Sequence, residues 1–358
     1  MADATLAIEV SCPMVEREGE VNARDRSARR RTVRAADVAK LAGVSQTTVS
    51  YVLNGVTNQV IRPETRKRVM EAASDLGYAP SGAARTLRMG HSNIVLLAIS
   101  SLRIGHSLGY LIEHLTSELT QLGLNLVVRR QEAGASLTPI WRELMPLAVV
   151  SSSPLDRADA QALVDAGVML VGADREGALE QSFHFGVDQH RIGCLQAEYL
   201  IGKGHRHFGY AAPNNPRLQK LFDLRLGGVV AELARHRLGP PAVRIVPADA
   251  AEAAKVVAEW QSQIPSVTAV CAYNDESAFA VLAAMDSMGL KAPDDLAVIG
   301  VDNVNFAPFA HPPLTSIDNR MDIVAKIIAL HCSRAAGASN ELFALPRHEI
   351  ALVVRQSA

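Results

Sequence analysis

The segment from Asp37 to Asn54, DVAKLAGVSQTTVSYVLN, contains two short helical patterns on either side of one glycine. Apolar side chains recur at helical spacing in both halves: Val38, Leu41 and Ala42 before the glycine, then Val49, Val52 and Leu53 after it. Gly43 can take the positive φ of a tight turn, and Ser45 stands where the second helix needs an N-cap. The pattern predicts a helix-turn-helix, with an ordinary αα-hairpin as the alternative.

The second of these helices leaves a polar and uncharged face outside its apolar stripe. That face carries amide and hydroxyl groups: Gln46, Thr47, Thr48, Ser50 and Tyr51. Such groups bond to base edges in the major groove of DNA, and the N–H groups at a helix start can meet a phosphate. A third helix is expected from Arg62 to Gly77, with Pro63 near its start and the glycine as its stop. A three-helix DNA-binding domain closes there.

Positive charge is concentrated at this end of the chain. Residues 24 to 90 contain 13 Lys or Arg and five Asp or Glu, a balance of plus eight. The whole chain has a net charge of −1, so the remaining residues carry minus nine. A basic head on an acidic body orients itself on DNA and releases counterions when it binds, so affinity should fall steeply with salt.

Residues 1–31 contain little that can pack and end in the run RDRSARRR, from Arg24 to Arg31. We expect a disordered basic arm; it either adds phosphate contacts, is a solvated tail, or reflects a start codon placed too early. The segment has no sustained apolar region of the kind that signal peptides need, and no run in the chain is long and apolar enough to span a membrane. The sequence therefore predicts a cytoplasmic protein.

Cysteines and histidines give no sign of a metal site. Cys12, Cys194, Cys271 and Cys332 lie far apart without CxxC spacing, so we expect buried small apolar side chains and neither disulfides nor zinc. His205 and His207 form an HxH pair, but two histidines without a third ligand are a weak metal signal. No cofactor and no metal are expected.

The body from Ser92 to Ala358 alternates short β-rich runs with helical stretches. The strand candidates are IVLLAI at Ile94, LNLVV at Leu124, LAVV at Leu147, MLVGA at Met169, HFGYAA at His207, AVRIV at Ala242, AVCAY at Ala269 and LAVIGV at Leu296. This order predicts an α/β fold of two lobes, each with a parallel sheet and crossover helices, and a ligand at the carboxyl ends of the strands.

The whole run from Asp37 to Val95 resembles the LacI/GalR family of transcriptional regulators, whose signature includes DVAxxAGVSxxTVSxVLN and YxPxxxARxL. Further landmarks follow as GVDQHRIGC, AYNDESAF, VIGVDN and HPPLTSID, so the resemblance covers about residues 33 to 357. It implies a small all-α helix-turn-helix head and two Rossmann-like subdomains similar to periplasmic sugar-binding proteins. The expected domains are the arm (1–31), the head (32–79), a hinge helix or linker (80–91) and an effector-binding and dimerisation domain (92–358).

The resemblance assigns DNA contacts residue by residue. Base contacts fall on Gln46, Thr47 and Tyr51, and backbone contacts on Ser45, Thr48, Ser50 and Asn54. In the hinge, Ala84 and Leu87 are expected at the minor groove, with Leu87 as the inserted wedge; the alternative is a linker residue packed on its own effector domain. So short a helix is unstable alone, and we expect it to fold only on DNA.

Two positions near the head depart from the family pattern. Ser81 stands where many members have asparagine, and Arg34 stands where they usually have the threonine that caps the first helix. We expect Thr32 to cap a slightly earlier helix start.

For the effector, the resemblance points to Asp188, Arg225, Asn274 and Asp302, which together offer hydrogen-bond donors and acceptors to a small polar ligand such as a sugar. The three acidic or amide residues have an alternative role as helix or loop caps. In the first lobe the loop LRIGHSLGY lacks the family's usual aromatic residues, which leaves Ser100, Ser101, Ile104 and His106 to line that wall. The segment RRQEAGASLTPIWRELMPLAVV is also short, which suggests a trimmed second helix.

These expectations combine into a homodimeric repressor that binds a pseudo-palindromic operator and responds to an effector between its lobes. Induction and corepression both remain open. The alternative is a solute-binding or enzymatic α/β domain with a helical interaction module. No nucleophile elbow, phosphate loop or convincing pair of catalytic acids is found, so we expect no enzyme.

Overall fold

The computed structural model describes residues 33–53, 60–78, 86–87, 89–100, 105–132, 135–151, 155–172, 182–183, 187–247, 249–337 and 349–358. The chain divides into two compact units, residues 1–84 and 85–358. The predicted arm and six further residues singled out above lie outside the described residues: Thr32, Asn54, Ser81, Ala84, Ser101 and Ile104. In the part of the chain that the structure describes, no helix is long and apolar enough to cross a membrane.

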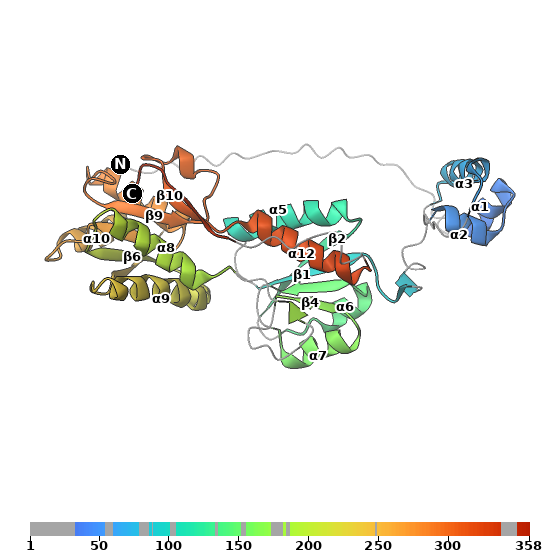
Figure 1. Ribbon diagram of the computed structural model, residues 1–358, viewed down its shortest axis with the longest axis horizontal. Coiled ribbons are helices and arrows are strands. Elements are labelled where there is room, and N and C mark those ends of the chain that lie inside the picture. Colours follow the sequence, from blue (N-terminus) through green and yellow to red (C-terminus); the bar gives the residue numbers. More distant parts are fainter. Residues whose placement is uncertain are drawn as a thin grey trace, which may run out of the picture. The chain divides into compact units, whose positions relative to one another are not determined.

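The first unit contains the three predicted helices, α1 (Ala35–Ala42), α2 (Gln46–Leu53) and α3 (Pro63–Asp75) (Figure 1). They share one small core, whose buried residues are Val38, Ala39, Ala42, Val49, Val52, Val69, Ala72 and Ala73. Gly43 ends α1 in the left-handed conformation, with φ of 65°, as the turn requires. The helix-turn-helix prediction is confirmed.

Two details of α1 differ from the prediction. Leu41 is 56% exposed, and the buried stripe includes Ala39 instead, because the face that packs on α2 and α3 is rotated toward that residue. The earlier helix start is also wrong, since α1 begins at Ala35. The Asp37 carboxylate accepts a hydrogen bond from the backbone N–H of Arg34 (2.8 Å), which satisfies a donor at the helix start from within the first turn.

Within the second unit, the first lobe is built on a five-stranded parallel sheet of order β2-β1-β3-β4-β5. Its strands are β1 (Ile94–Ser100), β2 (Asn125–Gln131), β3 (Ala148–Ser151), β4 (Met169–Val171) and β5 (Ser182–Phe183), and its helices are α5 (His106–Gln121), α6 (Thr138–Leu144) and α7 (Arg157–Asp165). Helices α5 and α12 (Met321–Ala335) lie side by side and share a core with β1 and β3 (Figure 1). Helix α6 has only seven residues, as the short segment indicated.

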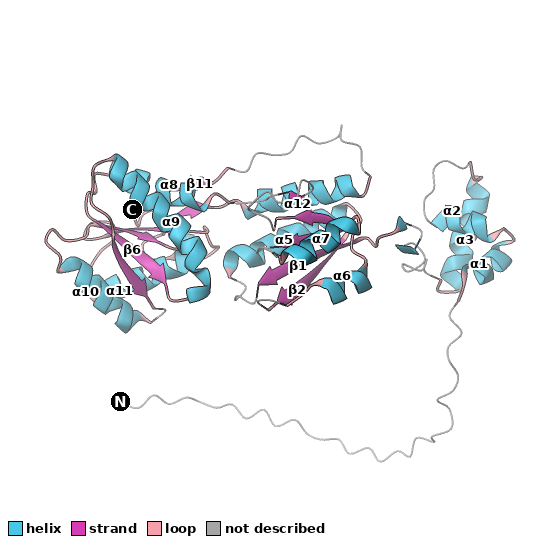
Figure 2. Cartoon of the chain, turned by 90° about the horizontal axis from the view of Figure 1, so that it is seen from below, coloured by secondary structure: helices cyan, strands magenta, loops and turns pink. Residues whose placement is uncertain are grey.

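The second lobe is built on a six-stranded sheet of order β11-β10-β9-β8-β6-β7. Its strands are β6 (Phe208–Pro213), β7 (Ala242–Val246), β8 (Ala269–Ala272), β9 (Ala297–Val301), β10 (Thr315–Asp318) and β11 (Ala351–Val353). Helices α8 (Gln189–Gly202) and α9 (Gln219–Arg235) pack on one face, and α10 (Ala250–Gln261) and α11 (Asp275–Ser287) pack on the other (Figure 2). Short 3₁₀ turns lie at Pro216–Leu218 and Ala307–Phe309.

All eight predicted strand runs contain a strand, and the α/β prediction with parallel sheets is confirmed. Three strands were not predicted, namely β5, β10 and β11. Strand β11 also pairs antiparallel with β10, so this sheet is not wholly parallel. Since α12 packs in the first lobe and β11 in the second, the chain passes between the lobes three times, before α8, before α12 and before β11.

Candidate functional site

The start of α2 presents the polar face that the sequence predicted. Gln46 and Thr47 are exposed in its first turn, whereas Thr48, Ser50 and Tyr51 are half-buried. The Ser45 hydroxyl accepts a hydrogen bond from the backbone N–H of Thr48 (3.1 Å) and lies 2.9 Å from the Thr48 hydroxyl. The predicted N-cap is therefore confirmed, and Gln46 and Thr47 are the side chains that project outward from a capped helix start.

The described part of the head is only weakly basic. Residues 33–53 and 60–78 contain six Lys or Arg and four Asp or Glu, a balance of plus two. The balance of plus eight over residues 24–90 therefore comes mostly from flanking residues: five arginines and one aspartate between 24 and 31, and Arg85 and Arg88. Most of the positive charge expected to meet phosphate thus flanks the three-helix core.

A short helical turn holds the predicted wedge residue. Thr86 and Leu87 are helical, and the Gly90 N–H donates to the Thr86 carbonyl (2.8 Å). The Leu87 side chain is 80% exposed. It is thus not packed on its own effector domain, which was the alternative considered for it.

Arg225, on α9, is the centre of the predicted effector residues. It is 5% exposed, and its guanidinium lies over the Tyr273 ring, 4.6 Å from the ring centroid. Its Nε donates to the Gln189 side-chain oxygen (2.6 Å), and its Nη1 donates to the Tyr273 carbonyl. Its described hydrogen-bond acceptors are thus neutral oxygens, and none of them is a carboxylate that would pair with the buried guanidinium.

Asp302 follows β9, at the carboxyl edge of the six-stranded sheet of the second lobe. Its carboxylate accepts hydrogen bonds from the Asn319 amide (2.9 Å) and from the Ser107 hydroxyl at the start of α5. Burial raises the pKa of Asp302, whereas the positive charge of Arg225 and the Ser107 hydrogen bond act in the opposite direction. Arg225 and Asp302 thus influence each other electrostatically, and Asp302 is bonded to a residue of the first lobe.

Asp188 and Asn274 both make the capping contacts that were their alternative role. Asp188 is exposed and accepts from the Arg191 N–H at the start of α8 (2.9 Å). Asn274 accepts from the N–H (3.0 Å) and the hydroxyl (2.9 Å) of Ser277 at the start of α11. Each cap uses one side-chain oxygen as the acceptor. Among the described contacts of α11, the side-chain NH₂ group of Asn274 has no partner.

His106 is the first residue of α5 and heads a row of rings along that helix. Its ring stacks on Tyr110 at 5.8 Å between centroids, and Tyr110 lies 4.2 Å from the His114 ring. His106 also contributes to the electrostatic environment of Asp302. Ser100 ends β1, and only its backbone is described.

Four residues that sequence reasoning did not single out contact this group: Gln189, Tyr273, Ser107 and Asn319. Two of them are adjacent to predicted residues, since Gln189 follows Asp188 and Tyr273 precedes Asn274. Ser107 likewise follows His106. Adjacency to a predicted site residue was the available signal for these three, and nothing local marked Asn319.

Asp275 lies directly behind the site and is fully buried. Its carboxylate accepts hydrogen bonds from the Ser316 hydroxyl (2.6 Å) and the Val304 N–H (2.8 Å). Burial raises the pKa of Asp275 to about 7, and the nearby Asp302 acts in the same direction.

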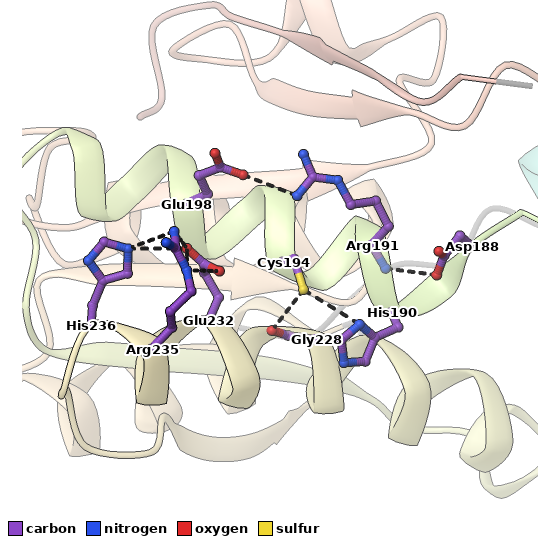
Figure 3. A network of polar contacts seen from close by, with 9 residues as sticks. All are labelled: Asp188, His190, Arg191, Cys194, Glu198, Gly228, Glu232, Arg235 and His236. Carbon is purple, nitrogen blue, oxygen red and sulfur yellow. Dashed lines mark hydrogen bonds and ion pairs between the residues drawn. The ribbon is translucent and has the colours of Figure 1, made fainter.

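Helix α8, which Asp188 caps, packs against α9, which carries Arg225, and side chains of both helices make polar contacts (Figure 3). The Cys194 thiol lies 3.4 Å from the Gly228 carbonyl and 3.5 Å from Nδ1 of His190. Further along α9, Glu232 is paired with Arg235 (2.6 Å) and His236 (3.2 Å). The Arg235 hydrogen bond is the main cause that lowers the pKa of Glu232. The Cys194 contact with Gly228 joins α8 to α9, whereas the pairs of Glu232 lie within α9 and its C-terminal end.

A cavity of about 380 Å³ lies elsewhere, at the amino-terminal edge of β6, β7 and β8. Its lining includes Arg206, His207, Phe208, Gly239, Pro240 and Ile264, and none of the predicted effector residues. Among the described residues no group of three or more potential ligands is arranged for a metal ion. Cys271 and Cys332 are buried as expected, Cys194 is half-buried, and Cys12 lies outside the described residues.

Both units of the chain match domains of known proteins. Residues 36–81 match the model for bacterial regulatory proteins of the lacI family, and residues 197–358 match a periplasmic binding protein-like domain. The chain is 31% identical over 291 residues to the HTH-type transcriptional repressor PurR of Edwardsiella ictaluri (strain 93-146), which covers 78% of this chain and 84% of the relative. It is 28% identical over 346 residues to PurR of Pasteurella multocida (strain Pm70), covering 90% and 97%.

A solved structure of the lac repressor dimer bound to operator and the anti-inducer ONPF shares the fold, with a TM-score of 0.72 and 25% identity over 91% of this chain and 98% of that one. The fold and the site thus define a ligand-responsive, DNA-binding transcriptional repressor, and the alternative of a solute-binding or enzymatic domain is not favoured. The chain belongs to the lacI family of bacterial regulatory proteins.

Proposed function

We propose that the start of α2 reads the operator, with base contacts from Gln46, Thr47 and Tyr51. The observation that supports this best is a capped helix start with exposed amide and hydroxyl groups on a separate compact unit. Backbone contacts would come from Ser45, Thr48, Ser50 and Asn54, with the flanking arginines adding phosphate contacts.

The hinge is proposed to act through the exposed Leu87, which would enter the minor groove together with Ala84 when residues 80–91 fold on DNA. An apolar side chain exposed to this extent carries a cost in water that burial between base steps would remove. The proposed domains are those expected above: a head over 32–79, a linker over 80–91 and an effector domain over 92–358. We further propose that the protein is cytoplasmic and performs no catalysis. It is proposed to be a homodimer, because a two-fold dimer matches an operator of two-fold symmetry.

The effector is proposed to be a small polar molecule bound by Arg225 and Asp302, with Asp188, Asn274, His106 and Ser100 around them. A buried guanidinium whose described acceptors are neutral, opposite a carboxylate, offers both a strong donor and a strong acceptor. Structural relatives with bound ligands support a sugar-like compound, since they include CelR in complex with cellobiose and a LacI family regulator with bound ribose.

The effector site can be tested by thermal shift of the full-length chain against D-ribose, cellobiose, other sugars and nucleosides. A compound that binds the folded state raises the melting temperature, and Arg225→Ala should abolish the increase. Lys220→Ala, which removes an exposed cation from the same helix, is the matched control and should keep it. Equal stabilisation of the wild type and Arg225→Ala would show that Arg225 does not contact the effector.

A further inference from the structure

The loop after β9 holds two consecutive residues in a conformation that glycine normally supplies. Asp302 has φ of 105° and Asn303 has φ of 47°. A side chain in this region is strained, and such residues persist only where their surroundings hold them. Two sets of contacts hold this pair.

One support comes from below the loop, through two buried side chains. The Asn303 N–H donates to the Ser316 hydroxyl (3.0 Å), which in turn donates to the Asp275 carboxylate (2.6 Å). The other oxygen of Asp275 accepts from the Val304 N–H (2.8 Å). Asp275 and Ser316 are both 0% exposed, so these bonds are not in competition with water.

The space for this carboxylate is kept free by a glycine. A Cβ placed on Gly300 would lie 2.0 Å from Oδ1 of Asp275. Because Asp275 is buried and bonded on both oxygens, it could not move aside cheaply.

A second support comes from the segment after β11. The Arg355 guanidinium donates to the Asn303 side-chain oxygen (2.7 Å) and to the Leu314 carbonyl (2.7 Å). The backbone N–H of Arg355 donates to the Thr315 hydroxyl (2.9 Å), which fixes the start of this side chain on β10. The loop is thus held from two directions by residues distant in sequence.

These supports set the direction in which the Asp302 carboxylate points. The Asp302 N–H is fixed on the Ile317 carbonyl (2.8 Å), and its carboxylate meets the Asn319 amide. The same amide lies 3.1 Å from the Ser107 hydroxyl at the start of α5. A carboxylate turned away from this position would lose the bond to the other lobe.

We propose that Asp275, Ser316 and Arg355 are positioning residues of the effector site, which hold Asp302 and Asn303 in the left-handed conformation and so direct the Asp302 carboxylate to Asn319 and Ser107. The inference rests on the proposed role of Asp302 in binding the effector. Through Arg355, the segment after β11 would then influence how the protein responds to its effector. Neither the position of this segment at the sheet edge nor its sequence indicates that role.

The test is hydrogen exchange of the full-length chain, followed in peptides that cover 302–305 and the first turns of α5. Asp275→Asn and Arg355→Gln each remove one support, and Asp302→Asn removes the carboxylate itself. Asp286→Asn, at an exposed position of α11, and Arg206→Gln, whose guanidinium also donates to carbonyls, are the matched controls. A conservative Ser316→Thr variant keeps the hydroxyl.

We expect both support variants to speed exchange about tenfold in 302–305 and also at the start of α5, as the loss of one buried hydrogen bond predicts. The change at α5 should equal that of Asp302→Asn, and a double variant with Asp302→Asn should add nothing there. Ser316→Thr and the two controls should leave α5 unchanged.

Exchange that accelerates only in 302–305, or equally throughout the second lobe, would overturn the proposal, because the supports would then act on local stability alone. This measurement needs no ligand. A negative thermal-shift result for Arg225→Ala would therefore count against the proposed effector site but not against these supports. A negative exchange result would count against the supports but not against the effector site.

Discussion

At the scale of single residues, the same side-chain types serve two purposes at this sheet edge. Asp188 and Asn274 cap helices, as their position after a strand predicts, while Asp302 is bonded to Asn319 and Ser107 instead. Local pattern was sufficient to place polar residues at the ends of β8 and β9. It could not find Asn319 or Arg355, because tertiary pairing of β10 and β11 brings them to the site.

The buried carboxyl of Asp275 predicts how the stability of the folded protein depends on pH. Burial raises the pKa of this carboxyl from 3.8 to about 7, so the folded protein retains a proton that the unfolded chain releases near the lower value. The stability that the protonated form contributes is therefore complete below about pH 4 and is lost as the pH rises through about 7. A shift of this size corresponds to roughly 4 kcal/mol.

Asp275→Asn removes this titration and should make the difference from wild type depend on pH. The variant loses an acceptor at every pH, but its melting temperature relative to wild type should rise by several degrees between about pH 5 and about pH 8. Asp286→Asn, measured in parallel, should show a constant difference. A constant difference for Asp275→Asn as well would mean that Asp275 is ionised across this range.

At the scale of elements, the pair α8 and α9 is the most constrained contact of the second lobe. A Cβ on Gly193 would lie 1.9 Å from the Arg225 carbonyl oxygen, and one on Gly228 would lie 1.9 Å from the His190 carbonyl oxygen. The two glycines therefore allow the helix backbones to touch, and this approach sets the position of Arg225. The strands of this lobe were predictable from their apolar runs, whereas the short β10 and β11 are defined by pairing more than by composition.

Gly193→Ala and Gly228→Ala should each destabilise the chain by about 1–3 kcal/mol or more, because the helices must separate or bend to admit the methyl group. Gly202→Ala is the control on α8, since a Cβ there meets no atom within 4 Å. It should be neutral or stabilising by about 0.5–1 kcal/mol. Urea unfolding of the three variants gives the comparison; if Gly193→Ala matches the control, the helices are not in backbone contact.

At the scale of the whole molecule, the chain joins a head that carries a polar helix start to a two-lobed domain whose polar residues meet at one sheet edge. Motifs made the order of these parts predictable, because the helix-turn-helix and the alternation of strands and helices are local patterns. The count over residues 24–90 hides how the charge is divided, since the described head has a balance of only plus two and the excess lies in its flanks. Phosphate attraction should accordingly depend on those flanking arginines as much as on the head.

Sequence-specific binding to DNA is the property that defines this chain as a repressor, and fluorescence anisotropy measures it. The full-length chain is titrated against a duplex selected by it from random sequences and against a shuffled duplex, over a range of salt concentrations. We predict at least about 10³-fold tighter binding to the selected duplex and an affinity that falls steeply with salt. Thr47→Ala and Leu87→Ala should weaken the preference, and Ser74→Ala, at an exposed position in the last turn of α3, should not. Equal affinity for both duplexes at every salt concentration would contradict the account.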